Sequence, residues 1–113
     1  MIISNETEND ILIVKIDGEI WKEEEQSIRD HFEDIFKRNI KKVIIDASNI
    51  QYLGSSTLGL FSKIHQQAAT NGARMIFADL SPFVKKIFKI TTFDKYFIIK
   101  YSIKDAADDL NKI

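Results

Sequence analysis

The sequence predicts an α/β domain, with a mixed β-sheet of about five strands and about four helices in the order ββαβαβαβα. Segments rich in β-branched residues alternate with segments whose apolar residues recur at helical spacing. This alternation is typical of a largely parallel sheet with covered faces. Residues 41–48, "KKVIIDAS", are apolar on both faces of a short strand, as expected in the middle of a sheet. We expect a single domain over residues 1–113.

The composition excludes several classes of protein. The chain has 44% hydrophobic and 29% charged residues, as in an ordinary globular domain. Its formal net charge of −1 argues against nucleic-acid binding, which needs a basic surplus on one face. No apolar run is long enough to cross a bilayer, the N-terminus does not resemble a signal peptide, and cysteine is absent. We therefore expect a cytoplasmic protein that contacts neither membrane nor nucleic acid.

The N-terminal half is expected to form a hairpin followed by a helix. Residues 1–8 pair with the β-branched stretch "ILIVKIDGEI", residues 11–20, whose strand is expected to end at Gly18. A helix is expected over residues 22–38, with glutamates at 23–25 in its first turn, where negative charge suits the helix dipole. Its apolar residues share one helical face, namely Ile28, Phe32, Ile35 and Phe36.

The C-terminal half is expected to alternate helices and strands. A second helix begins at Ser55 or Ser56 and ends near Thr70. The inward face of this helix consists of Leu58, Phe61, Ile64 and Ala68. The remaining predicted elements are, in order, a strand over residues 73–80, a helix capped by Ser81, a strand over residues 95–101 and a helix over residues 103–113.

A pair of serines lies where the third strand passes through a loop into the second helix, in "DASNIQYLGSSTLGLF", residues 46–61. The free N–H groups and the dipole of a helix N-terminus stabilise negative charge. A serine at this position is therefore well suited to carry a phosphate. The residues alone equally allow Ser55 and Ser56 to be a helix N-cap and a first-turn residue.

The sequence does not indicate an enzyme. "GSSTLG" resembles the nucleophile elbow of hydrolases, but the last glycine of that motif would have to replace Leu58, and the chain is far shorter than such a hydrolase. His31 and His65 lie in predicted helices, and nothing places either of them beside the serines. No glycine-rich phosphate-binding motif is present.

The segment "VIIDASNIQYLGSSTLGLFSKIHQQAATNGARMIFADLSPFVKKIFKITTFDKYFII" resembles the core of a STAS domain. More narrowly, it is similar to the bacterial anti-sigma factor antagonists of the sporulation and general-stress type. "ILIVKIDGEI" resembles the second strand of that family, which typically ends in Gly-Glu-Ile or Gly-Glu-Leu, and "LSPFVKKIFKIT" resembles its third helix. The resemblance covers nearly the whole chain and implies the STAS fold.

The resemblance also implies a phosphorylation switch. In that family the loop typically reads Met-Asp-Ser-(Ser/Thr/Ala)-Gly-Leu-Gly, and its first serine is phosphorylated by a partner that is both an anti-sigma factor and a kinase. The unphosphorylated form binds this partner and frees the sigma factor, whereas phosphorylation breaks the complex. By position, Ser55 is the implied phosphoacceptor, Ser56 is the second choice, and Leu58 and Gly59 lie at the helix start.

Three positions depart from the family pattern. Gly54 replaces the aspartate before the serine, Thr57 replaces the glycine after the serine pair, and Trp21 replaces an aspartate found in many members. Without these acids the local field is less negative, which changes what a kinase would meet. The expected partner-binding residues are Trp21, Gly54, Ser55, Ser56, Thr57 and Leu58.

The leading functional hypothesis is an anti-sigma factor antagonist that regulates transcription and is switched off by phosphorylation at Ser55. Such a protein needs no bound metal or cofactor, because the kinase supplies the ATP. One alternative is a scaffold or sensor module of a larger signalling complex that uses the same loop without phosphorylation. Another is a small-ligand or nucleotide binder at the same junction. None of these hypotheses predicts an oligomeric state.

Overall fold

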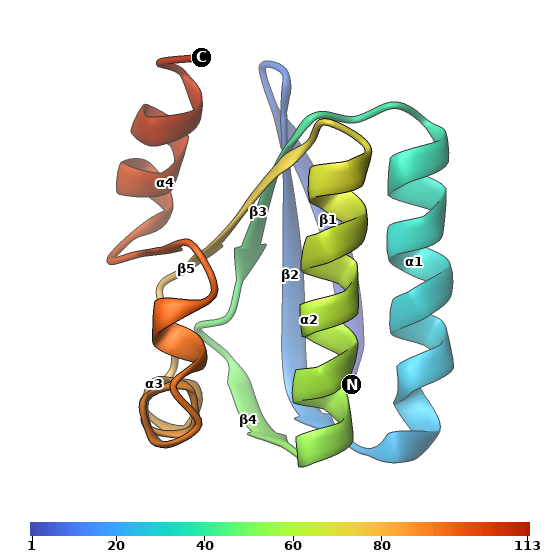
Figure 1. Cartoon of the computed structure of the whole chain (residues 1–113), viewed down its shortest axis with the longest axis vertical. Coiled ribbons are helices and arrows are strands. Elements are labelled where there is room, and N and C mark those ends of the chain that lie inside the picture. Colours follow the sequence, from blue (N-terminus) through green and yellow to red (C-terminus); the bar gives the residue numbers. More distant parts are fainter.

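A six-stranded mixed sheet forms the centre of the structure, a computed structural model that describes all 113 residues (Figure 1). The strands are β1 (Ile2–Glu8), β2 (Ile11–Ile20), β3 (Lys42–Asp46), β4 (Ile50–Leu53), β5 (Arg74–Ala78) and β6 (Ile99–Lys100). The helices are α1 (Glu25–Lys37), α2 (Ser55–Thr70), α3 (Pro82–Ile90) and α4 (Ile103–Leu110), with 3-10 turns at η1 (Lys22–Glu24) and η2 (Phe93–Lys95). The predicted α/β class is confirmed, with one strand more than the predicted order contains.

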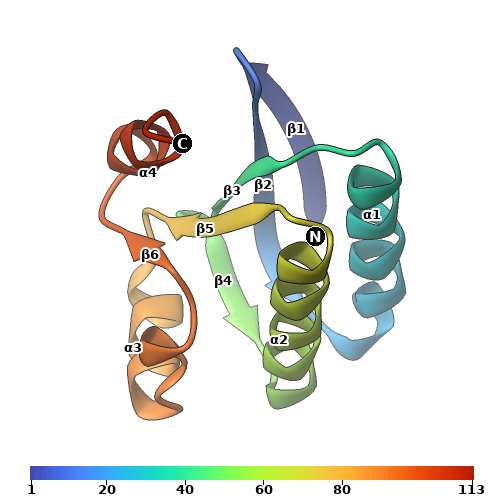
Figure 2. The same ribbon diagram turned by 45° about the horizontal axis from the view of Figure 1, so that its top comes forward.

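The strand β3 lies in the middle of the sheet, as the sequence predicts. The strand order is β1-β2-β3-β5-β6, in which β1 pairs antiparallel with β2 and the other neighbours are parallel. Val43, Ile44 and Ile45 are fully buried because one face of β3 is covered by α1, α2 and α3 and the other face by α4. Figure 2 shows α4 on the opposite side of β5 from α2 and α3.

The second strand continues beyond Gly18, where the sequence analysis ends it. Gly18 adopts a positive φ of 99°, which glycine tolerates best, and the register shifts between Gly18 and Glu19. This bulge turns the end of β2 away from β3, so that residues 18–20 pair with β4 instead. The prediction that the strand ends at Gly18 is therefore wrong, because the glycine marks a bulge inside the strand.

The strand β4 was expected to be a loop. It consists of four residues that pair in parallel with the end of β2, with Ile20 opposite Leu53. Ile50 and Leu53 are buried and Gln51 is exposed, a pattern too short to identify a strand from the sequence alone. The partner strand supplies the hydrogen bonds, and only the fold brings that partner into place.

The strand β6 is shorter than the predicted span of residues 95–101. Only Ile99 and Lys100 pair with β5. The preceding residues form the turn η2, which brings Phe93 and Phe97 together at 5.4 Å between ring centroids and packs Phe97 against Phe88 at 5.3 Å. Aromatic packing at this point takes the place of strand pairing.

The predicted inward faces of the first two long helices are confirmed. On α1 the residues Ile28, Phe32 and Ile35 are fully buried and Phe36 is half-buried. On α2 the four predicted residues are buried: Leu58, Phe61, Ile64 and Ala68. None of the helices combines the length and hydrophobicity needed to traverse a membrane.

Two aromatic residues of the core provide a test of this packing. The ring of Phe77 contacts Phe61 at 5.5 Å and Phe88 at 5.3 Å between centroids, and all three residues are fully buried. Phe61→Ala and Phe88→Ala should each lower the free energy of unfolding by ~3 kcal/mol or more, because each leaves a cavity that cannot collapse fully. Urea unfolding measures the loss, with Ile90→Ala on the exposed side of α3 as the control. Midpoints close to wild type at an unchanged slope would contradict the assigned faces.

Candidate functional site

The candidate site lies at the N-terminus of α2, where β4 ends beside the end of β2. The residue that precedes the helix is Gly54, which is extended at φ −97° and ψ 177° and accepts a hydrogen bond from Leu58 N at 3.2 Å. Gly54 is therefore the N-cap, and no side chain caps the helix. The interpretation of Ser55 as a capping residue is wrong, because Ser55 is already the first helical residue.

The hydroxyl group of Ser55 is free and accessible. Ser55 is exposed, and its Oγ takes part in no hydrogen bond within the chain. The first N–H groups of a helix have no partner inside the helix, and they create a positive partial charge at this end. A phosphate on Ser55 would therefore meet a favourable field without displacing an existing contact.

The other two hydroxyl groups of this turn are held by a buried glutamate. Ser56 Oγ donates to Glu25 Oε2 at 2.5 Å, and Thr57 Oγ1 donates to the same oxygen at 3.1 Å. The second oxygen, Oε1, faces Arg29 Nη2 at 3.6 Å. Glu25 is only 4% exposed and Thr57 only 1%, so this carboxylate has its partners in a largely dry environment.

Glu25 is the site residue that the sequence analysis missed. It was expected with its two neighbouring glutamates in the first turn of a helix, where negative charge suits the helix dipole. The 3-10 turn η1 takes up residues 22–24, so that α1 begins at Glu25 with its side chain directed toward the start of α2. The sequence offered one signal for this contact, namely Glu25 at one helix start and the hydroxyls of Ser56 and Thr57 at the next. No local pattern, however, shows that the two helix starts meet.

Aromatic side chains border the exposed serine. Trp21 is 48% exposed and lies on Tyr52 with 4.4 Å between ring centroids, and Tyr52 contacts Phe83 at 5.6 Å. A shallow pocket of about 240 Å³ lies between these rings and the helix start, lined by Ile20, Trp21, Lys22, Tyr52, Gly54, Ser55, Ser56 and Thr57. Its lining contains one cation, Lys22, and no carboxylate.

The structure gathers five of the six predicted partner-binding residues around this pocket. They are Trp21, Gly54, Ser55, Ser56 and Thr57. Leu58 is only 5% exposed and belongs to the core cluster, so it offers almost no surface to a partner. The side chain of Thr57 is also turned inward, toward Glu25. Trp21, Ser55 and Ser56 are exposed, and of the two serines only Ser55 has an unbonded hydroxyl.

The two histidines do not line the pocket at Ser55 and contact other parts of the chain. His31 Nε2 lies 2.7 Å from Asn5 Oδ1, and His65 packs against Tyr96 and Phe97 at 5.3 and 5.5 Å between ring centroids. Burial lowers the pKa of both imidazoles, and at His31 the nearby Asp34 opposes this shift. No group of three or more His, Asp or Glu side chains is arranged to hold a metal ion.

The STAS domain family model matches residues 3–106 of the chain. A STAS-domain containing protein of Pseudomonas aeruginosa is 31% identical over 88 residues, which are 78% of this chain and 86% of the relative. A candidate anti-sigma factor antagonist from Thermotoga maritima has a similar structure, with a TM-score of 0.88 at 16% identity over 96% of this chain and 94% of that chain. The structure of the anti-sigma factor antagonist SpoIIAA in its unphosphorylated form has a TM-score of 0.81 at 18% identity, over 99% of this chain and 98% of that chain. The phosphorylated form of SpoIIAA from Bacillus has a TM-score of 0.72 at 16% identity, over 96% of this chain and 99% of that chain.

The contact between Glu25 and α2 can be tested by removing the carboxylate. Glu25→Ala should lower the free energy of unfolding by ~1–3 kcal/mol, because the hydroxyl of buried Thr57 loses its acceptor. Glu25→Gln retains an acceptor oxygen and should lower the free energy of unfolding by less than Glu25→Ala does. Urea unfolding provides the measurement, and Glu23→Ala, an exposed change in the preceding turn, is the control. Equal stability of Glu25→Ala and wild type would show that this contact does not hold the two helix starts together.

The depressed pKa values of the histidines predict a loss of stability in mild acid. The unfolded chain binds protons with the ordinary pKa near 6.5, whereas the folded chain resists protonation of His31 and His65. Stability should therefore be full well above that value and fall as the pH drops through and below 6.5. Asp10 and Asp109 have pKa values lowered by Lys42 and Arg74, so their contributions are lost only in stronger acid.

Urea midpoints measured across this pH range provide the test. A variant with both His31→Gln and His65→Gln should show a flatter profile than wild type, because glutamine does not titrate. Identical pH profiles of the two proteins would contradict the prediction.

Proposed function

This chain belongs to the STAS domain family, and we propose that it is an anti-sigma factor antagonist. It binds an anti-sigma factor in the cytoplasm and thereby releases a sigma factor for transcription. The proposal is supported by the fold shared with SpoIIAA. The single observation that carries it is the exposed, unbonded hydroxyl of Ser55 at the first residue of α2. In this role the chain is a binding partner and not an enzyme.

We propose Ser55, and not its neighbour, as the phosphoacceptor. Ser55 Oγ has no partner to lose, whereas Ser56 Oγ donates to the buried carboxylate of Glu25. Phosphorylation of Ser56 would remove this donor and bring a near-divalent anion toward another negative group. SpoIIAA from Bacillus has been solved in a phosphorylated form, so phosphorylation is a property of at least one protein with this fold.

Phosphorylation would act on the partner more than on the fold. At an exposed helix N-terminus, added negative charge is favoured by up to ~1 kcal/mol. A partner packed over Trp21 and Ser55 would instead have to desolvate the phosphate, which is costly. Trp21 is the proposed anchor for that partner, since aromatic residues often dominate interface energies. Its side chain is half-exposed and packs against the ring of Tyr52. Phosphorylation therefore releases the anti-sigma factor.

The proposed partner is an anti-sigma factor with serine kinase activity, which supplies the ATP. Because the lining around Ser55 contains Lys22 and no carboxylate, this partner should not depend on a cationic contact there. The same absence of acids is the observation that favours a second candidate function. In that case the chain is a scaffold or sensor module that binds its partner through Trp21 without a phosphate cycle. The pocket of about 240 Å³ is shallow for a small-ligand site, so a nucleotide binder is not favoured.

Two substitutions at Ser55 test the switch. Ser55→Asp should leave thermal stability nearly unchanged and weaken binding to the anti-sigma partner, because a carboxylate suits the helix end but not a packed interface. Ser55→Ala should retain binding and accept no phosphate. The measurements are mass spectrometry after treatment with the cognate kinase and ATP, and binding titrations of each variant. Ser27→Asp, an exposed serine on α1, is the matched control.

Each outcome separates the two candidate functions. Phosphate on Ser56 or Thr57 would move the acceptor site by one or two residues. No phosphate at all, with binding that is indifferent to Ser55→Asp, would reject the switch and favour the scaffold. Loss of binding on Trp21→Ala in that case would still place the partner on this surface.

A further inference from the structure

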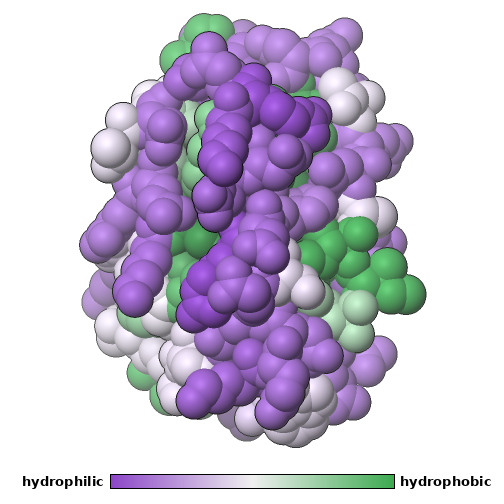
Figure 3. Space-filling model, turned by 90° about the vertical axis from the view of Figure 1, so that its right-hand side faces the viewer, coloured by the Kyte–Doolittle hydropathy of each residue, from purple (hydrophilic) through white to green (hydrophobic).

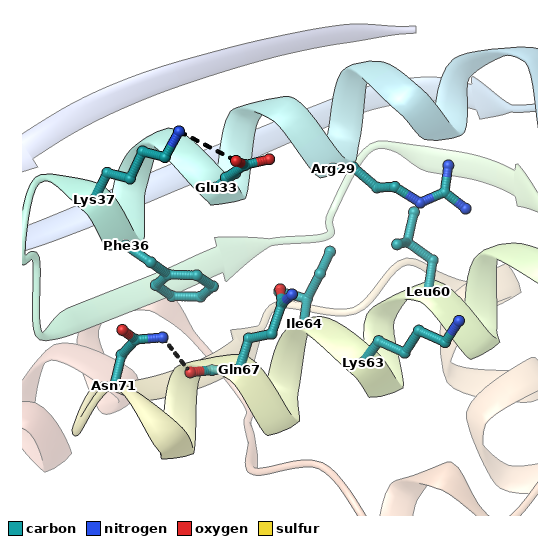
Figure 4. Close-up of a pocket in the computed structure, with 9 residues that line it drawn as sticks. All are labelled: Arg29, Glu33, Phe36, Lys37, Leu60, Lys63, Ile64, Gln67 and Asn71. Atoms are coloured by element: carbon teal, nitrogen blue, oxygen red, sulfur yellow. Dashed lines mark hydrogen bonds and ion pairs between the residues drawn. The ribbon is translucent and has the colours of Figure 1, made fainter.

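A groove of about 380 Å³ runs between α1 and α2, and the proposed function does not use it. Figure 3 looks onto the side of α1 and shows hydrophobic surface recessed between hydrophilic ridges. Figure 4 shows the side chains that line the groove, which come from two neighbouring helices. They are Arg29, Glu33, Phe36, Lys37, Leu60, Lys63, Ile64, Gln67 and Asn71. None of them lines the pocket at Ser55.

The floor of the groove is apolar. Leu60 and Ile64 are 5% and 2% exposed, and the half-buried ring of Phe36 faces them from α1. These three residues also complete the packing between the two helices. Leu60 and Ile64 add only narrow accessible edges, so Phe36 provides most of the apolar surface that an incoming side chain can contact.

The walls of the groove are positively charged. Three cationic side chains and one carboxylate line it. Lys37 pairs with Glu33 at 3.2 Å and Arg29 with Glu25 at 3.6 Å, whereas Lys63 takes part in no ion pair. The exposed Lys37–Glu33 pair contributes little, so Lys37 can turn to an incoming carboxylate at low cost, whereas Arg29 is held by the buried carboxylate of Glu25.

The outer side of α2 is otherwise poor in charge. Lys63 is the only Lys, Arg, Asp or Glu residue in this helix, although 29% of the whole chain is charged. The exposed residues beside Lys63 are small or uncharged, namely Gly59, Gln66, Gln67, Ala69 and Thr70. Depletion of charged residues is a feature of the centre of protein-binding surfaces.

We propose that this groove binds an acidic amphipathic helix of a partner protein. The apolar side chains of that helix would enter the groove at i and i+3 or i+4 spacing, and its carboxylates would meet Lys63 and the neighbouring cations. A second copy of this chain fits less well, because all four of its helices already bury their apolar faces against their own sheet. This docking does not require Ser55 and does not depend on the proposed switch.

Two synthetic peptides provide the test with the full-length chain. The first is an amphipathic peptide of about 15 residues with leucine at helical spacing and Asp or Glu elsewhere, and the second carries Lys in place of each acid. Binding is followed by NMR chemical-shift changes. The acidic peptide should shift the amide signals of groove residues on α1 and α2, more strongly at low salt than at high salt. The basic peptide should not bind there.

Lys63→Glu should weaken binding of the acidic peptide by about 10-fold, because it replaces an attraction with a repulsion. Lys86→Glu makes the same change of charge on α3, outside the groove, and should leave the affinity unchanged. Both are exposed positions, and thermal unfolding verifies that each variant is folded. Ser55→Asp should also leave this affinity unchanged, which separates the groove from the proposed switch.

Several results would overturn the proposal. They are equal binding of the basic peptide, no binding of the acidic peptide, an unchanged affinity in Lys63→Glu, or shifts confined to the Ser55 pocket. Sedimentation that shows a dimer of this chain, dissociated by Lys63→Glu, would identify a second copy as the occupant instead.

Discussion

The strand β3 buries both of its faces, and this constraint arranges the rest of the molecule. Val43, Ile44 and Ile45 are fully buried, so each face of the sheet needs a cover. The larger core forms under α1, α2 and α3, and the smaller one forms under α4. Because helices that connect neighbouring parallel strands with right-handed crossovers fall on one face, three helices gather there. The helix α4 covers the other face, where Ala106 and Leu110 pack with Ile44 and Ile76.

This arrangement brings the starts of α1 and α2 together, and the contact there is polar. Glu25 accepts hydrogen bonds from Ser56 and Thr57 while Arg29 stands at its other oxygen. A buried carboxylate is costly without partners, so these contacts favour one relative position of the two helix starts. They also give the two serines different roles, because the hydroxyl of Ser56 holds Glu25 and the hydroxyl of Ser55 remains free.

Two surfaces of α2 then differ in chemistry. Its first residue lies beside the aromatic side chains of Trp21 and Tyr52, with the positive end of the helix dipole available for an anion. Farther along, the groove that it forms with α1 combines an apolar floor with Lys63 and other cations. Under the two proposals, a phosphate on Ser55 would break a contact at the first surface and leave a contact at the second surface intact.

The sequence by itself determined the α/β class, the inward faces of α1 and α2, and the place of the serines at a helix start. These features are local: helical spacing, β-branched runs and a double-sided apolar strand can each be identified within a few residues. The tertiary structure alone decided that residues 50–53 form a strand, that Glu25 is buried and that Gly54 caps α2. It also decided that Lys63 faces a groove shared with α1. The strand at residues 50–53, the burial of Glu25 and the groove at Lys63 each depend on a partner about 30 residues away, and the pairing of such distant segments is set by the packing of the whole sheet and not by any local pattern.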